Sequence, residues 1–401
     1  MGTAELIRIE EARRRVLAAV GPLEHENVPL DEALGRVLAE EVRSQGHVPP
    51  FDSSAMDGFA VAAGAEGDLE VVDEARAGAP ASTAVAPGTA VRISTGAAIP
   101  TGTEAVVALE LTEGDAATVT VPRSEPGANI RRRGEDIRTG DLVMAPGHSL
   151  RPAALGVLAS VGRSAAVCSK RPAVAILATG DELIEPGSEP GPGQIWSSNP
   201  PALAGQVIDA GAAVGRIVQV PDDPGATRSA LESAAATADV VVVSGGVSVG
   251  DHDHVKGALA AIGAEEVFWG VALRPGKPTW FGTLAVDGRS VAVFGLPGNP
   301  VSAMVCFQLF VRPALRCLQG ADPGGVRAIA VLDEDIVRNP RRDQAVRCRL
   351  STAEDGLHAA PTGAQGSHVL TSMLAADALA LVDAGEGAAR RGERVAVELL
   401  A

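Results

Sequence analysis

The clearest pattern in the chain is a series of short apolar segments between residues 171 and 318, each followed by a glycine-rich loop. Residues 173–179 (AVAILAT) and 239–243 (DVVVV) lack the alternation of a half-exposed strand, so they predict strands that are covered on both faces. Helical spacing follows from Asn199 and again over residues 225–238. Strands that alternate with helices predict a parallel α/β sheet.

The other segments have different patterns. Residues 4–20 place apolar side chains at helical spacing, and residues 30–42 repeat this after Pro29 with Asp31 as a cap, so two helices are predicted. Residues 50–145 contain short β-like runs between glycines and prolines, which indicate a β-rich module. After the glycine-rich linker at 320–325, short alternating runs predict a small β-barrel or sandwich.

Composition narrows the class of protein. The 401 residues are 46% hydrophobic and 21% charged, as in globular chains. This length is more than a single hydrophobic core usually accommodates, so more than one domain is expected. A formal charge of −16 argues against a nucleic-acid partner. The four cysteines form no CxxC pair, which favours reduced thiols in the cytoplasm. We expect no membrane span and no export, because apolar runs are short and the N-terminus lacks an apolar signal core.

Three unusual loops leave strands of the predicted sheet: ATGDEL (178–183), SGGVSVGDHDH (244–254) and GLPGNPVS (295–302). Taken singly, each loop fits an ordinary strand-to-helix turn. Together at the carboxyl edge of one sheet they predict a phosphate-bearing ligand, because glycine N–H groups and hydroxyls cradle phosphate oxygens. The candidate binding residues in these loops are Thr179, Gly180, Ser244, Gly245, Gly246, Ser248, Gly250, Gly298, Asn299 and Ser302.

Acidic side chains lie beside these glycines. Glu182 and Asp253 suit Mg²⁺, which takes oxygen ligands and is commonly shared between carboxylates and phosphates. His252 and His254 suggest zinc only weakly, because no further Cys or His lies near them, so solvated loop histidines are the better interpretation. The arginine run at 131–133 is either a solvated face or an anion clamp.

Seven motifs in this order resemble the MoeA-type molybdopterin molybdenumtransferase family, which is related to the gephyrin E domain. They are SAMDGFA (54–60), RISTGAAIP (92–100), NIRRRGEDI (129–137), LATGDEL (177–183), SGGVSVGDHD (244–253), RPGKP (274–278) and GLPGNPVS (295–302). The resemblance covers nearly the whole chain. Each motif alone is weak, and together they are highly specific.

The resemblance implies an elongated chain of four domains and a cytoplasmic homodimer. The implied units are a helical and linker dimerisation domain (1–48 with 141–170), a β-rich domain (49–140), an α/β molybdopterin-binding domain (171–319) that resembles the molybdopterin adenylyltransferase fold, and a C-terminal β-barrel (320–401). The active-site cleft would lie between the α/β domain of one subunit and the β-rich domain of the other. The reaction implied is Mg²⁺-dependent insertion of molybdate into adenylylated molybdopterin with release of AMP, alongside a transient contact with molybdopterin adenylyltransferase.

Carried over by motif, the catalytic residues would be Asp57, Thr95, Asp136, Glu182, Asp222, Asp253, Pro297 and Pro300. Arg274 and Lys277 would offset the charge of the ligand, and molybdate would also meet Arg341, Arg342 and Ser367. Three positions depart from the family pattern: Phe59 where tyrosine is common, Arg274 where lysine is usual, and Gly270 where a basic residue is common.

Alternative functions are a gephyrin-like scaffold and a nucleotide-pyrophosphate hydrolase built on the same α/β domain. No long linker or added partner module supports the scaffold. SAMDGF and NIRRRGED argue against the hydrolase, whose class lacks them. A tungsten-inserting variant stays open, because tungstate and molybdate have nearly the same size and charge.

Overall fold

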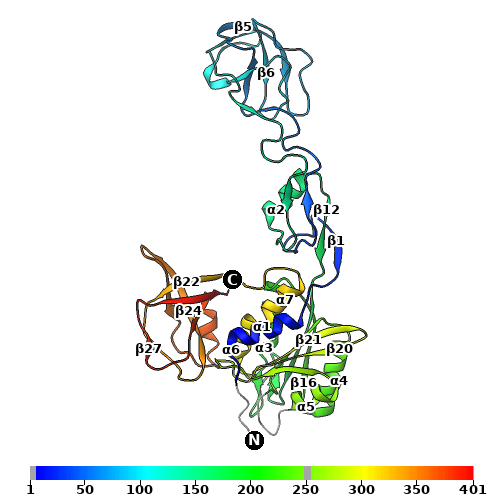
Figure 1. Cartoon of the computed structure of the whole chain (residues 1–401), viewed down its shortest axis with the longest axis vertical. Coiled ribbons are helices and arrows are strands. Elements are labelled where there is room, and N and C mark those ends of the chain that lie inside the picture. The colour runs from blue at the N-terminus through cyan, green and yellow to red at the C-terminus, as the bar shows by residue number, and fades with distance from the viewer. Residues whose placement is uncertain (1–5, 248–253, 401) are drawn as a thin grey trace.

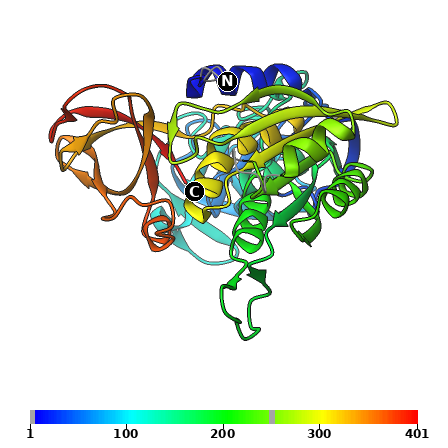
Figure 2. The same ribbon diagram turned by 90° about the horizontal axis from the view of Figure 1, so that it is seen from below.

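The computed structural model describes residues 6–247 and 254–400, and the molecule is elongated (Figure 1). A β-rich body lies at one end, a narrow segment with α2 and β12 lies in the middle, and a broad base holds the α/β sheet and the C-terminal strands. The molecule thus has four regions of different secondary structure. Two of them, the α/β sheet and the C-terminal strands, lie side by side in the base (Figure 2).

The base contains a six-stranded sheet in the order β16-β13-β17-β21-β20-β18. The first four strands are parallel, as the apolar runs predict, and the last two are antiparallel. Asp287 and Gly288 cause this reversal, because both have positive φ (49° and 78°), the geometry of a type I′ hairpin turn. The strands are β13 (Ala173–Thr179), β16 (Ala213–Val220), β17 (Val240–Ser244), β18 (Glu265–Trp269), β20 (Trp280–Val286) and β21 (Arg289–Leu296).

Helices cover both faces of this sheet, so its central strands are apolar throughout. Alternate residues of β17 belong to two separate cores: Val240 and Val242 pack on the side of α3, and Val241 and Val243 pack on the side of α4 and α5. The helices are α3 (Asn199–Asp209), α4 (Pro224–Ala235), α5 (His254–Ala261), and one continuous helix made of α6 (Pro300–Cys306), a π-helical segment (Phe307–Val311) and α7 (Arg312–Leu318).

This continuous helix, Pro300–Leu318, is the core helix of the base. By length and composition it is apolar enough to cross a membrane, but 78% of its apolar window is buried inside the protein. Asn299 precedes it without a side-chain capping hydrogen bond, and Pro300 occupies its first turn, where a missing N–H breaks no helical hydrogen bond. Its apolar surface is therefore accounted for by packing within the fold.

The narrow middle segment differs from the prediction in one respect. β1 (His25–Pro29) pairs with β12 (Ala165–Ser169), β2 (Val42–Arg43) pairs with β11 (Leu142–Met144), and α2 is Pro152–Ser160. The helix predicted at 30–42 is wrong: this stretch is turns and isolated bridges, with Val37 opposite Ser149 and Leu38 opposite Cys168. Gly35 has φ of +75°, which interrupts any helix there.

The β-rich body at the far end is built around one sheet in the order β7-β4-β6-β5-β9-β8. Its apolar residues form two small cores on the two faces of that sheet. The elements are β3 (Ser53–Ser54), β4 (Gly58–Val61), β5 (Gly67–Ala75), β6 (Thr89–Ile93), β7 (Ala105–Ala108), a 3₁₀ turn (Leu109–Leu111), β8 (Glu113–Gly114), β9 (Thr118–Val121) and β10 (Ile130–Arg131).

The C-terminal strands form a barrel rather than a sandwich. The order is β19-β24-β25-β22-β28-β26, and β24 pairs again with β26, which closes the ring. Closure removes free strand edges. The elements are β19 (Leu273–Arg274), β22 (Arg327–Leu332), β23 (Ile336–Val337), β24 (Asp343–Ala353), β25 (Gly356–Pro361), α8 (Thr371–Leu374), β26 (Ala378–Val382), β27 (Ala388–Ala389) and β28 (Arg394–Leu399).

The first helix, α1 (Ile9–Ala19), joins the barrel to the α/β core rather than to the middle segment. Arg13 on α1 is 5% exposed; its Nε donates to the carbonyl of Leu309 at 2.9 Å, and its Nη2 pairs with the buried carboxylate of Glu398 on β28. A buried charge is tolerated only when it is paired and hydrogen-bonded. Arg13 therefore connects α1, the core helix and the barrel.

We predict that Arg13→Met lowers the free energy of unfolding by about 3 kcal/mol, because Glu398 then stays buried with only Arg327 at 3.9 Å. Urea denaturation followed by circular dichroism measures this. Arg14→Met is the control, since Arg14 is exposed and, among the described residues, its one ion pair is with the partly exposed Glu11. The double variant Arg13→Met/Glu398→Leu should be more stable than Arg13→Met; equal stability of wild type and Arg13→Met would contradict the role of the buried pair.

Candidate active site

The three loops predicted to converge start at neighbouring strand ends. β13, β17 and β21 are adjacent and parallel, with Ala178 opposite Ser244 and Ser244 opposite Leu296. Parallel neighbours in register end at the same edge of the sheet, so their carboxyl-terminal loops emerge together.

Direct contacts tie these loops to one another. The side-chain Nδ2 of Asn199 donates to Ser244 Oγ and to the carbonyl of Gly298, each at 2.7 Å. The N–H of Gly245 donates to the carbonyl of Leu296 at 3.0 Å. A Cβ at Gly245 would lie 2.8 Å from Thr179 Oγ1, and its φ is +97°, so only glycine fits this approach. Asn199 was expected only as a helix start, and the structure adds this bridging role.

The loops enclose a cavity of about 540 Å³. Thr179, Glu182, Ser244, Gly298, Asn299 and Pro300 line it, all of them predicted from the sequence, and so do Leu183, Ile195, Trp196, Ser197, Ser198, Asn199 and His368. The hydroxyl of Thr179 is buried and has no hydrogen-bond partner among the described residues. An unpaired buried hydroxyl is costly, so the cavity favours a ligand oxygen at this point.

The other residues predicted in these three loops lie either outside the cavity lining or outside the described residues. Gly180 and Gly246 lie in the same loops, with φ of +146° and +63°. Pro297 is buried, and Ser302 is buried in the first turn of α6, outside the cavity lining. Ser248, Gly250 and Asp253 lie outside the described residues.

Glu182 is positioned by its own loop. A Cβ at Gly180 would be 2.5 Å from Glu182 Oε2, so the carboxylate packs against the glycine backbone. Asp222 stabilises the same turn rather than lining the cavity: its carboxylate accepts from the N–H of Asp181 at 3.4 Å, and Asp181 accepts from the N–H of Asp222 at 3.0 Å. Within the described chain no group of three Asp, Glu, His or Cys side chains is placed to hold a metal, although the oxygen donors around Glu182 are of the type that Mg²⁺ prefers.

Asp57, Thr95 and Asp136 lie in or beside the β-rich body, at the opposite end of the molecule from the cavity (Figure 1). Asp57 and Thr95 are brought together, since Asp57 Oδ1 accepts from the N–H of Thr95 at 2.8 Å, and all three residues are exposed. Nearby, Arg132 pairs with Asp52 at 2.8 Å. The N–H of Arg133 and then the Arg132 guanidinium lower the pKa of Asp52, so part of the arginine run is occupied by this carboxylate.

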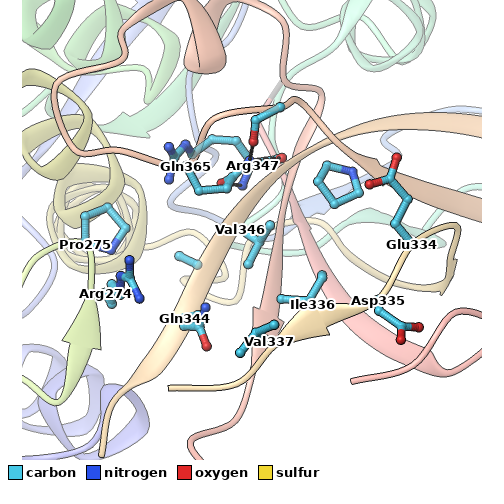
Figure 3. Close-up of a pocket in the computed structure, with 13 residues that line it drawn as sticks. Arg274, Pro275, Glu334, Asp335, Ile336, Val337, Gln344, Val346, Arg347 and Gln365 are labelled. Atoms are coloured by element: carbon cyan, nitrogen blue, oxygen red, sulfur yellow. Dashed lines mark hydrogen bonds between the residues drawn. The ribbon is translucent and has the colours of Figure 1, made fainter. Parts of the chain in front are cut away.

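A second cavity of about 350 Å³ lies between Arg274 and the barrel (Figure 3). Arg274 and Pro275 lie on one side of it, and Glu334 and Asp335 lie on the other. Asp335 is already paired with Arg390 at 2.7 Å. The segment before Arg274 is held by the start of the chain, as the N–H of Ala272 donates to the carbonyl of Ile7 at 2.7 Å and the N–H of Ile7 donates to the carbonyl of Gly270 at 3.3 Å.

Arg347 gives this second cavity its charge. It is 1% exposed and forms no ion pair with any described carboxylate; its Nε donates to Ser372 Oγ and its Nη2 to the carbonyl of Gly366, both at 3.1 Å. Burial lowers the pKa of Arg347 to about 10, and the charge of Arg274 acts in the same direction. Because Asp335 is paired with Arg390, the two arginines are opposed in this lining by Glu334 alone, and the remaining positive charge favours an anion beside Arg274 and Arg347.

Several predicted anion contacts are not in that lining. Lys277 is exposed, and the backbone N–H groups of Arg341 and Arg342 donate to Asn339 Oδ1. The carbonyl of Ser367 accepts from the N–H of Val301 at 3.2 Å, so the barrel loop contacts the start of the core helix. That contact brings His368, which no sequence motif singled out, to the first cavity.

Two departures from the family pattern have structural explanations. Phe59 is 5% exposed and belongs to a core of the β-rich body, where its ring is packed among apolar side chains. Gly270 has φ of +88°, and a Cβ there would lie 2.8 Å from Leu6 Cδ2. A basic residue at this position would therefore be strained in this backbone.

Comparisons with known proteins agree over the whole chain. Three family models match: "MoeA N-terminal region (domain I and II)" over residues 7–162, "Probable molybdopterin binding domain" over 175–317, and "MoeA C-terminal region (domain IV)" over 330–400. Molybdopterin molybdenumtransferases of Bacillus subtilis and Haemophilus influenzae are each 35% identical, covering 98% of this chain and 94% and 98% of their own lengths.

A solved structure has the same architecture. The crystal structure of the molybdopterin biosynthesis MoeA protein from Pyrococcus horikoshii is 32% identical, with a TM-score of 0.83 over 98% of this chain and 100% of that one. Together with the matches above, this shows that the chain belongs to the MoeA family of molybdopterin molybdenumtransferases.

Proposed function

We propose that this protein inserts molybdate into adenylylated molybdopterin and releases AMP. The observation that carries the proposal is the convergence of three loops on one cavity that contains the unpartnered hydroxyl of Thr179. A diphosphate supplies acceptor oxygens for that hydroxyl, for Ser244 and for the loop N–H groups. The names of the relatives agree with this substrate class.

Within this cavity the protein would bind and orient the diphosphate. Thr179 and Ser244 donate hydrogen bonds to it, and Asn199 keeps the second and third loops in place. Glu182 would hold Mg²⁺, together with Asp253, which lies outside the described residues. When bound, Mg²⁺ supplies charge neutralisation that makes the diphosphate a better leaving group.

We assign the second cavity to molybdate. Arg347 and Arg274 supply positive charge there, and Gln344 and Gln365 line it with amide groups, so a small tetrahedral dianion is held without losing its hydrogen bonds. One barrel loop contributes to both cavities, since Gln365 lines the second and His368 lines the first, and Ser367 contacts the core helix, so both substrates would bind beside the same loop. Tungstate has the same shape and charge and should compete.

The exposed acids of the β-rich body point to a second subunit. The β-rich body, in or beside which Asp57, Thr95 and Asp136 lie, is at the opposite end of the molecule from the α/β sheet (Figure 1), so they would not reach the cavity of their own chain. We infer a homodimer in which they complete the cavity of the partner. A cytoplasmic location and a transient contact with molybdopterin adenylyltransferase follow from the family resemblance.

The proposal predicts molybdate-dependent release of AMP. Purified protein is incubated with adenylylated molybdopterin and Mg²⁺, molybdate or tungstate is added, and nucleotide release is followed. Release should be slow until the oxyanion is added. Equal release without any oxyanion would contradict insertion and would favour the nucleotide-pyrophosphate hydrolase.

Glu182→Gln should slow AMP release by about 100-fold while the fold is retained, because the metal and diphosphate lose a carboxylate. Mixed dimers test the shared cavity. Subunits carrying only Asp57→Asn and subunits carrying only Glu182→Gln should be inactive alone, and the mixture should regain activity at one of its two cavities. If the mixed dimers form but stay inactive, the shared cavity is wrong.

Arg274→Gln should raise the molybdate concentration needed for half-maximal AMP release by about tenfold, because one charge-assisted hydrogen bond is lost. The saturating rate should change little. Arg228→Gln is the matched control, since Arg228 is exposed on α4 and pairs with Glu232. An unchanged molybdate dependence in Arg274→Gln would exclude the second cavity as the oxyanion site.

A further inference from the structure

Two aromatic side chains are exposed among the described residues, Phe51 at 46% and Trp196 at 54%, and only Trp196 lies at the first cavity. The chain contains only three tryptophans and is 2% aromatic. Trp280 is 2% exposed and Trp269 is partly buried, whereas Trp196 is 54% exposed and lines the first cavity. An exposed indole beside a polar cavity is available to a ligand.

The backbone around Trp196 is firmly held. β14 (Leu183–Ile184) pairs in parallel with β15 (Ile195–Trp196). The N–H of Ile195 donates to the carbonyl of Glu182 and the N–H of Ser197 to that of Ile184, each at 2.8 Å. Trp196 is therefore fixed on the strand that pairs with β14, whose first residue directly follows Glu182, the proposed metal ligand.

The indole itself is also oriented. Its Nε1–H donates to the carbonyl of Ser188 at 2.8 Å, within the same loop. This bond satisfies the one polar atom of the side chain, so the ring has no further hydrogen bond to offer. What remains for a ligand is the flat π-face, which binds another aromatic ring by stacking.

We propose that Trp196 is the stacking platform for a heteroaromatic ring of the bound substrate, either the adenine or the pterin. The inference rests on the proposed function, because a pterin nucleotide carries both rings on either side of a diphosphate. With the diphosphate at Thr179 and Ser244, a ring on one side of it meets Trp196 across the same cavity. Trp196 thereby selects a substrate with a planar base at that end.

Isothermal titration with wild type and variants tests this. AMP with Mg²⁺ is one arm, 6-hydroxymethylpterin is the second, and ribose 5-phosphate is the ringless control. Trp196→Ala should weaken binding of one ring compound by about tenfold, Trp196→Phe should restore most of it, and ribose 5-phosphate should bind all three proteins equally. The arm that responds identifies the ring. Ile208→Ala, an exposed apolar side chain on α3 outside the cavity lining, is the matched control.

Each other outcome is informative. If wild type binds AMP or the pterin and Trp196→Ala binds it equally well, the stacking role is overturned while the proposed function stands. If wild type binds neither compound, the proposed ligand of the cavity fails and the stacking role fails with it. If Trp196→Ala keeps its affinity for both rings but sediments as a smaller species, Trp196 is a subunit contact and the proposal is wrong.

Discussion

Everything in the candidate site depends on the parallel register of β13, β17 and β21. Because these three strands run side by side in one direction, the loops that follow them share one edge, and glycines let them approach to contact distance. Asn199 then fixes two of the loops with a single amide group. Without that register the same residues would lie on unrelated surfaces, and neither the cavity nor the contact with the barrel would form.

The second constraint is the elongation of the molecule. A narrow middle segment separates the β-rich body from the base that holds the cavity, and this separation is the reason for proposing that a second subunit completes the site (Figure 1). The middle segment is held by short two-stranded pairings and a small core of its own. In the proposed dimer it would act as a spacer whose length determines which surfaces of the two subunits face each other.

The predictions from the sequence are confirmed where a pattern of residues reflects a local physical requirement. The double-sided burial of 173–179 and 240–243 is visible in composition alone, and so is the need for glycine at 245. The prediction failed at residues 30–42, where helical spacing competes with Gly35 and with pairing to the distant residues Ser149 and Cys168. His368, Arg347 and Trp196 became visible only in three dimensions: the barrel brings His368 and Arg347 to the cavities from far along the chain, and the β14–β15 pairing sets Trp196 beside Glu182.

The pairing of Ile7 with the segment 270–272 has a practical consequence. These backbone hydrogen bonds hold the segment that leads to Arg274, although neither Ile7 nor residues 270–272 line the second cavity. Loss of residues up to Ile7, through a tag cleaved too close or a translation start a few codons downstream, would keep every residue that lines the second cavity. It would still loosen the backbone that positions Arg274. Preparations that differ only ahead of Arg8 would then differ in the position of Arg274, although every residue that lines the second cavity is the same in both.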